Sequence, residues 1–471
     1  MKYRLLRCIY VMVFGFLSFT TAAQTQNQEW SVDVSNRWQT HEGWGVSLCW
    51  WANMCGRWDD KNVEELVDWL VSPKGLNYNI FRYNIGGGED PENRHCTPHH
   101  MAHGKGVRAE MEGFQDELGG EYHWERDEAQ RRIMLMIKKK RPDAIFEAFS
   151  NSAPWWMTFS GCVGGNTIAT VDNLNPVYYK AFAQYLVDVC KHYKEAYGIE
   201  FRTLEPFNEP VTDYWYANGS QEGCHFGARA QTEFVKVLYP ILKESGLKTV
   251  ISASDETNVE TSVNSLKTYL DEGVLQFIGQ WNTHTYGGSI EAKKELQRLT
   301  SKFGVRFWQS ETGDGGHGIH GNLRMAQRLI DDVRYLKPSA WVDWQYVEEN
   351  GDQWSLVTTD SQWHQYTRHH NFYVRKQFSH FIPAGYTFVE CGSKQALAAV
   401  SPNGKRLVLV VLNTSGETVN HKVELPHVEK ATCYRTSEYE NTLQTKEFTL
   451  SEKQLQFQLP PLSIATVVCK L

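Results

Sequence analysis

The sequence predicts a (β/α)₈ TIM barrel followed by a smaller C-terminal β-sandwich. From about residue 43 to residue 378, short apolar runs alternate with amphipathic, helix-like stretches. After Tyr386 the pattern changes to short strands separated by polar turns, and no helix pattern is visible there. A long β-then-α rhythm is typical of a parallel barrel, whereas a run of short strands alone is typical of a sandwich.

Eight segments of the first region have the composition of buried barrel strands. They are residues 43–47, 79–83, 144–149, 202–207, 249–252, 277–281, 305–309 and 340–345. Helical patterns lie between them, for example at residues 62–70, 127–140, 176–197 and 231–244. Because the active site of such a barrel forms at the C-terminal ends of its strands, candidate residues are sought there.

Four strands are expected in the second region, and one of them alternates strictly between apolar and polar residues. They are residues 407–412, 422–425, 455–459 and 464–468, with the strict alternation at 455–459. The stretch 29–38 is expected to add a strand to this sandwich. The expected organisation is therefore a signal peptide (1–23), an N-terminal segment joining the sandwich (24–41), a catalytic barrel (42–380) and a β-sandwich (381–471), packed without a flexible linker.

The N-terminus has the pattern of a secretory signal peptide. Lys2, Arg4 and Arg7 precede or flank an apolar run that extends to Phe19, and small residues follow up to Ala23. This run is shorter than the roughly 20 residues that span a bilayer. We therefore expect cleavage after Ala23, a secreted or periplasmic chain and no stable membrane insertion, with an uncleaved anchor as the alternative.

The composition favours a carbohydrate as partner. A net charge of −7 and a pI near 6.2 give no reason to expect binding to nucleic acid or an anionic membrane. Seventeen Trp and an aromatic share of 13% suit both a large core and flat platforms for sugar rings. We expect a polysaccharide or oligosaccharide substrate and a monomer. Of ten Cys, nine remain after cleavage, so we expect few disulfides or none.

Two glutamates close predicted barrel strands. Glu209 follows the fourth strand in Asn-Glu-Pro, and Glu311 ends the seventh. Hydrolysis of a glycosidic acetal needs one carboxylic acid to protonate the leaving oxygen and one carboxylate as nucleophile or base. Asn-Glu-Pro alone is a weak signal, since a loop carboxylate can cap a helix and a strand-end glutamate can form a salt bridge. The pair, placed across one barrel mouth, predicts catalysis.

A histidine-rich stretch, His95–His103, invites a zinc interpretation. Its spacings do not form a clean helical pair, and acetal hydrolysis by two carboxylates needs no metal. It falls in the long loop after the second strand, where shaping of the substrate site is the expected role. We therefore expect neither a metal nor a cofactor.

Several motifs together resemble glycoside hydrolase family 30. They are residues 42–45, 81–88, 150–157, 208–210 and 310–312, together with 372–386 at the passage into the sandwich. Within the family, residues 43–52, 111–114 and 122–124 are most similar to the endo-β-1,6-galactanase subgroup. The resemblance implies a retaining double displacement, with Glu209 as acid/base and Glu311 as nucleophile.

The same resemblance assigns supporting roles, residue by residue. Arg82 matches a partner of the nucleophile, Asn208 a ligand of the sugar 2-hydroxyl, and Tyr286 a second contact of the nucleophile. The other expected contacts of the sugar or the acid/base are His284, Trp344, Trp156, Glu89 and Trp51.

The sequence leaves the substrate open. The family resemblance also allows β-1,6-glucan, xylan, a β-fucoside or β-xyloside, or a glycolipid such as glucosylceramide. Endo-action and exo-action depend on loop shape, which the sequence does not give. A barrel that binds polysaccharide without cleaving it is a different class of function, and loss of Glu209 or Glu311 would be its signature.

Overall fold

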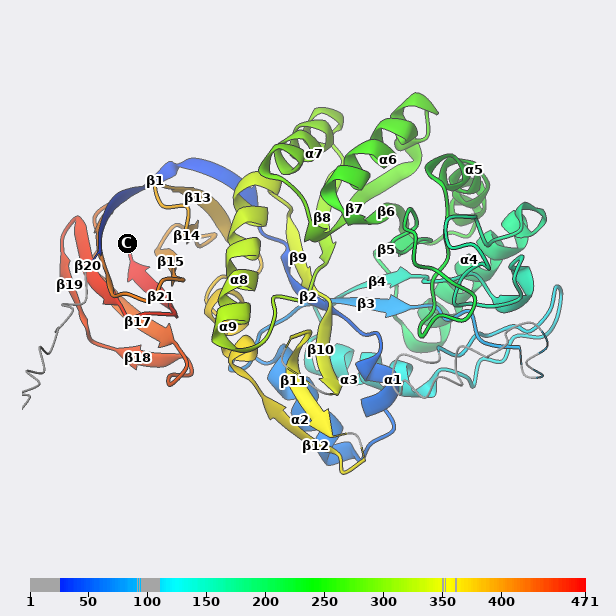
Figure 1. Ribbon diagram of the computed structural model, residues 1–471, viewed down its shortest axis with the longest axis horizontal. Helices are drawn as coiled ribbons and strands as arrows, with labels where there is room; N and C mark the ends of the chain where they lie inside the picture. Colours follow the sequence, from blue (N-terminus) through cyan, green and yellow to red (C-terminus); the bar gives the residue numbers. More distant parts are fainter. Residues whose placement is uncertain are drawn as a thin grey trace, which may run out of the picture.

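A computed structural model describes residues 26–90, 92, 94, 111–349, 351, 353–360 and 362–471. Eight parallel strands close a barrel in chain order, which confirms the predicted fold (Figure 1). The strands are β2 (Gly43–Ser47), β3 (Ile80–Asn84), β4 (Ile145–Phe149), β5 (Thr203–Glu205), β6 (Val250–Asn258), β7 (Ile278–Gly287), β8 (Arg306–Glu311) and β9 (Ala340–Asp343). Each overlaps a predicted segment, and β6 and β7 extend further toward the C-terminal mouth than expected.

Helices lie between successive barrel strands and cover the barrel from outside (Figure 1). They are α1 (Trp51–Cys55), α2 (Asp60–Val71), α3 (Glu128–Lys140), α4 (Tyr179–Tyr197), α5 (Ala228–Glu244), α6 (Val259–Asp271), α7 (Ile290–Phe303), α8 (Gly318–Asp331) and α9 (His370–Ser379). Helix α2 shows why they form: Asp59 accepts a hydrogen bond from the Asn62 amide as its N-cap, and Val63, Leu66 and Leu70 recur at helical spacing on the buried face.

The barrel interior is apolar at one end and polar at the other. Ile80, Trp308 and Ala340, which lie near the starts of their strands, belong to a small apolar cluster. Further along the strands, Arg82 and Glu147 are both fully buried and joined by an ion pair. Because buried charges are tolerated only when they are paired and hydrogen-bonded, this polar filling fixes side chains rigidly below the mouth.

A three-stranded sheet that the sequence did not predict follows the last barrel strand. It consists of β10 (Gln345–Glu349), β11 (Ser355–Asp360) and β12 (Gln365–Arg368), in that order. Its strands are short, and β12 is only partly buried, so the hydrophobic pattern is weak. The sheet matters for function because Trp344 and Trp354 directly precede β10 and β11.

The remaining strands form a second β domain at one side of the barrel (Figure 1). They are β1 (Gln26–Thr40), β13 (Thr387–Cys391), β14 (Ala396–Val400), β15 (Arg406–Asn413), β16 (Val419–Glu424), β17 (Lys430–Thr436), β18 (Leu443–Thr445), β19 (Phe448–Ser451), β20 (Gln454–Leu459) and β21 (Ser463–Lys470). Strand β1 runs parallel to β16 and antiparallel to β13, so it joins the two layers. The expected contribution of the N-terminal segment to the sandwich is thereby confirmed.

The two domains pack directly on each other. Gln377 of α9 donates a hydrogen bond from Nε2 to Thr436 Oγ1 at 2.9 Å, and its carbonyl accepts one from Thr466 Oγ1 at 2.7 Å. Both contacts are buried and join the last barrel helix to β17 and β21. The sandwich therefore braces the barrel from the side and leaves the barrel mouth to the loops.

Two further features concern the rest of the chain. Within the described ranges no helix is long and apolar enough to cross a membrane. Cys162 is disulfide-bonded, and the other described cysteines are free and buried. The expected signal peptide (1–23) and the histidine cluster (95–103) lie outside the described residues.

Candidate active site

Glu209 lies at the mouth of the barrel, just after β5. Its backbone has a φ of +47°, and its amide donates a hydrogen bond to the Asp255 carbonyl at 2.9 Å. The indole of Trp215 donates to the Glu209 carbonyl, also at 2.9 Å. A left-handed backbone is uncommon for a residue other than glycine, and here neighbours on both sides hold it. Its side chain is held by two contacts, with Tyr214 at Oε2 and with His284 at Oε1.

Glu311 ends β8 on the opposite side of the mouth. Its Oε1 accepts a hydrogen bond from the Tyr286 hydroxyl at 3.0 Å, and its Oε2 accepts one from Arg82 Nη1 at 2.9 Å. Both carboxylate oxygens thus receive a donor, which favours the ionised form and fixes its orientation.

The two glutamates are close enough to act on one sugar. One carboxylate oxygen of Glu209, one of Glu311 and a ring nitrogen of His284 all lie within 4.8 Å of one another. Retaining glycosidases hold their two carboxyl groups about 5–5.5 Å apart, whereas inverting ones leave room for a water between them. The arrangement is therefore that of a retaining pair.

Arg82 is the cation on which this cluster is built. Its side chain is fully buried on β3 and forms ion pairs with Glu147, Asp255 and Glu311. The planar guanidinium has five N–H donors, so a single arginine can serve three carboxylates in fixed directions. Arg82 matches its expected role as partner of Glu311, but because it is enclosed by protein it does not itself face the cavity.

Asp255 is a central member of the cluster that the sequence did not reveal. It accepts hydrogen bonds from Arg82 and from the Ser310 hydroxyl, and His284 Nε2 lies 3.2 Å from its Oδ1. Burial acts to raise the pKa of Asp255, but Arg82 and His284 outweigh it and hold this pKa below its usual range. Asp255 lies within β6 in a stretch that resembles no motif of the expected set, so no local signal marked it.

His284 connects the acidic groups. Its Nδ1 lies 3.0 Å from Glu209 Oε1, and its Nε2 faces Asp255. Burial acts to lower the pKa of His284, but the charges of Glu311 and Asp255 dominate and raise it to about 10. The ring is therefore an imidazolium near neutral pH, and both nitrogens are donors.

The pKa of Glu311 is raised to about 7. Burial is the largest cause, opposed by the positive charges of His284 and Arg82, while the nearby Glu209 carboxylate adds to the increase.

Above the two carboxylates lies a cavity of about 430 Å³. Its walls are mainly aromatic, from Trp50, Trp344, Trp354 and Tyr286, and the rings of Trp50 and Trp344 meet edge to face at 5.1 Å. Asn208 also lines it, and its Oδ1 has no protein partner among the described residues. Flat apolar walls around a few polar groups are the usual construction of a sugar site.

The structure corrects the assignment of Trp51. This side chain is fully buried, donates from Nε1 to the Ser47 carbonyl at 2.9 Å and packs against Tyr346 outside the cavity. Trp50, one residue earlier, lines the cavity instead. Two adjacent tryptophans cannot be told apart by pattern, because the direction of each depends on how the chain turns into α1.

Two other expected contacts lie away from the cavity. Trp156 donates from Nε1 to the Gln115 carbonyl at 2.9 Å and meets Tyr178 edge to face at 5.6 Å. Glu89 is half-buried beyond β3. Neither is among the residues that line the space above Glu209 and Glu311, so their contact with the substrate stays a prediction.

One wall of the cavity comes from a loop that the sequence did not single out. It follows Glu209 and contributes Tyr214, Trp215 and residues 219–221. The loop is anchored by Glu222, whose Oε1 accepts a hydrogen bond from the Gly87 amide at 2.9 Å and whose Oε2 accepts one from Asn84 at 2.8 Å. These contacts join residues far apart in sequence, so only the folded chain shows them.

The described residues contain one group that has the geometry to hold a metal ion, namely Glu209, His284 and Glu311. The charges do not suit a cation, however. An imidazolium has no free nitrogen lone pair with which to bind a cation. The arrangement fits acid, base and nucleophile better than it fits a metal centre.

Comparison with known proteins gives the site a context. The model of O-glycosyl hydrolase family 30 matches residues 27–305. An endo-β-1,6-galactanase of Hypocrea rufa is 30% identical, over 81% of this chain and 80% of its own. An endo-1,6-β-D-glucanase of Aspergillus fumigatus is 24% identical, over 78% and 77%. A solved structure, a conserved exported protein from Bacteroides fragilis, superposes with a TM-score of 0.79 at 20% identity, covering 94% of this chain and all of that one.

Proposed function

This chain belongs to O-glycosyl hydrolase family 30, and we propose that it is a secreted endo-β-1,6-galactanase that uses Glu209 as acid/base and Glu311 as nucleophile. The observation that carries the catalytic assignment is the placement of these two carboxylates, one just after β5 and one at the end of β8, with oxygens within 4.8 Å of each other. The proposed substrate is the β-1,6-galactan of arabinogalactan side chains.

In the first step Glu209 gives its proton to the glycosidic oxygen while Glu311 attacks the anomeric carbon. The bond to the leaving oxygen breaks, the shortened chain departs as an alcohol, and a covalent bond joins the sugar to Glu311. Arg82 and Tyr286 hold the attacking carboxylate in place. Asn208 is positioned to bond the sugar 2-hydroxyl, a contact that strengthens in the transition state.

In the second step Glu209 acts as a base. It removes a proton from a water molecule, which attacks the anomeric carbon and releases Glu311 as a carboxylate. Two inversions at the same carbon leave the product with the configuration of the substrate. His284 supports both steps, because its positive charge lies between the two carboxylates and stabilises whichever of them is ionised.

The choice of galactan rests on similarity rather than on a contact in the site. It is supported by the galactanase of Hypocrea rufa and by residues 43–52, which include Trp50 in the cavity wall. A β-1,6-glucan is the competing substrate, because the Aspergillus fumigatus relative is named for that linkage.

Product analysis distinguishes these substrates. The enzyme is incubated with debranched β-1,6-galactan, β-1,6-glucan and xylan, and the early products are separated by chain length. A ladder of galacto-oligosaccharides is expected from the first polymer alone. Faster release from β-1,6-glucan would contradict the galactan proposal, and galactose as the sole early product would contradict endo-action.

Secretion has its own test. The signal peptide expected at residues 1–23 predicts that the exported protein begins at Gln24. N-terminal sequencing of protein from the periplasm or culture medium is expected to start there. Retention of the full chain in the membrane fraction would contradict cleavage.

A further inference from the structure

Tyr214 lies on the wall of the cavity and touches the acid/base. It follows Glu209 in an irregular loop segment, and 42% of it is exposed. Its hydroxyl donates a hydrogen bond to Glu209 Oε2 and lies 3.2 Å from Thr257 Oγ1. Neither the motifs of the sequence nor the mechanism above gives this tyrosine a role.

The two oxygens of Glu209 differ in their surroundings. Oε1 faces His284, which is fully buried and does not line the cavity. Oε2 faces Tyr214, which does line it. An acid must present its proton to the leaving oxygen of a substrate in the cavity, so Oε2 is the oxygen that does this work. In the free enzyme that position is taken by the tyrosine hydroxyl.

We propose that the Tyr214 hydroxyl occupies the place of the leaving-group oxygen on Glu209 and that the bound substrate displaces it. Tyr214 is then a positioning residue of the leaving-group side, and its ring borders the first sugar beyond the cleavage point. This inference rests on the proposed role of Glu209 as acid/base.

The Tyr214 hydroxyl retains a hydrogen-bond partner after the substrate displaces it from Glu209. Thr257 Oγ1 is already within hydrogen-bonding distance and remains as a partner when Glu209 is given up. The ring meets Trp215 edge to face at 4.7 Å, and Trp215 is fixed by its bond to the Glu209 carbonyl. A side chain at Gly223 would collide with that indole, at 2.0 Å from a Cβ atom. The Tyr214 side chain can therefore move while it stays packed against the fixed Trp215 indole.

Displacement of the Tyr214 hydroxyl by the substrate can be distinguished from a hydrogen bond that persists in the complex, because the two affect different pH profiles. In the free enzyme the Tyr214 hydroxyl donates a hydrogen bond to Glu209 and so favours the ionised form of this carboxyl group. In the complex with substrate this bond is absent. The pH profile of kcat/KM reports groups of the free enzyme, and that of kcat reports groups of the complex. Removal of the hydroxyl must therefore change the first profile and not the second.

The test is Tyr214→Phe, assayed on a β-1,6-galacto-oligosaccharide over a range of pH. The alkaline limb of kcat/KM, where the acid loses its proton, is expected to move up by about 0.5–1 pH unit, the value of one hydrogen bond. The alkaline limb of kcat is expected to stay in place. KM is expected to fall a few-fold, because the substrate no longer replaces an existing bond.

The control is Tyr216→Phe, a nearby exposed tyrosine that does not line the cavity, for which no shift is expected. Equal shifts of both profiles in Tyr214→Phe, or no shift in either, would overturn the inference. Glu209→Ala separates this failure from that of the proposed function. If the pH profile of Glu209→Ala has no alkaline limb, the assignment of Glu209 as the acid stands. If the alkaline limb is still present, both the proposed function and this inference are overturned.

Discussion

Individual residues at this site act through charges that burial makes strong. Arg82, His284 and Tyr286 each contact at least one of the two carboxyl groups proposed to be catalytic. These groups are shielded from solvent, so the loss or gain of one hydrogen-bond donor changes the pKa of a carboxyl group. The dependence of activity on pH changes with it. This allows the role of single atoms to be tested.

Tyr286→Phe tests the acidic side of the pH profile. Activity is lost at low pH when Glu311 takes up a proton, and burial raises its pKa to about 7. The Tyr286 hydroxyl donates to the carboxylate and favours the ionised form, so its removal raises this pKa further. The acidic limb of kcat/KM is expected to move up by about 0.5–1 pH unit. An acidic limb that does not move in Tyr286→Phe would contradict the hydrogen bond between Tyr286 and Glu311.

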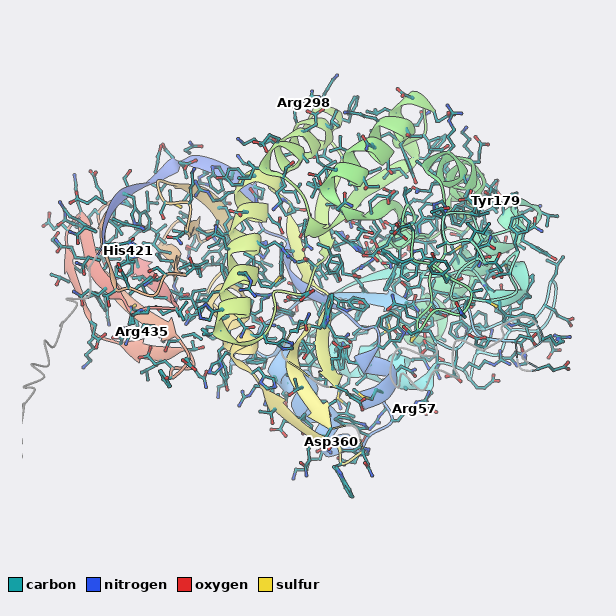
Figure 2. All side chains as sticks on the ribbon, in the orientation of Figure 1. Arg57, Tyr179, Arg298, Asp360, His421 and Arg435 are labelled. Carbon is teal, nitrogen blue, oxygen red and sulfur yellow. The ribbon has the colours of Figure 1, made fainter. Side chains whose placement is uncertain are left out.

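Arg82→Met tests whether the buried arginine stabilises the fold as well as the nucleophile. The variant leaves Glu147, Asp255 and Glu311 without their cation, which costs about 3–5 kcal/mol when one partner of a buried pair is removed. The free energy of unfolding in urea is expected to fall by that amount. Arg298→Met is the control, because Arg298 lies at the outer edge (Figure 2) in an exposed pair with Glu295, and exposed pairs contribute little to stability. Equal losses would refute the account of the core.

At the scale of elements, we expect the short sheet β10–β12 to contribute to substrate binding. Trp354 precedes β11, lines the cavity and lies 6.2 Å from the Tyr286 ring. Trp354→Ala is expected to raise KM for the polymer at least about tenfold, the cost of one lost stacking contact, and to change kcat less. Trp363→Ala, in the turn between β11 and β12, is the control, since Trp363 is 66% exposed and does not line the cavity. A normal KM in Trp354→Ala would remove this sheet from the site.

The sequence predicted elements better than contacts. The eight barrel strands were predictable because each is a short apolar run and most are followed by a helical pattern, and the positions of Glu209 and Glu311 at the barrel mouth could be inferred from the same strands. Asp255 was not predictable, since its contacts with Arg82 and His284 come from other strands, and the contact of Tyr214 with Glu209 depends on how an irregular loop folds. The confusion of Trp51 with Trp50 has the same origin, because the direction of a side chain in a turn is set by packing.

At the scale of the whole molecule, the barrel supplies the chemistry and the sandwich supplies support. No step of the mechanism requires a metal, and the imidazolium of His284 leaves no nitrogen for one. Dialysis against EDTA is expected to leave kcat and KM unchanged, measured against the same protein dialysed without chelator. A large loss that zinc or calcium restores would contradict this and direct attention to His95–His103.

The central claim is that Glu311 forms a covalent bond to the sugar. It is tested by incubation with a 2-deoxy-2-fluoro-β-galactoside that carries a good leaving group, followed by mass spectrometry of the intact protein and of its peptides. The account predicts the mass increase of one fluorinated glycosyl group, on the peptide that contains Glu311, and none in Glu311→Gln. A stable adduct on another residue, or turnover by Glu311→Gln at the normal rate, would contradict it.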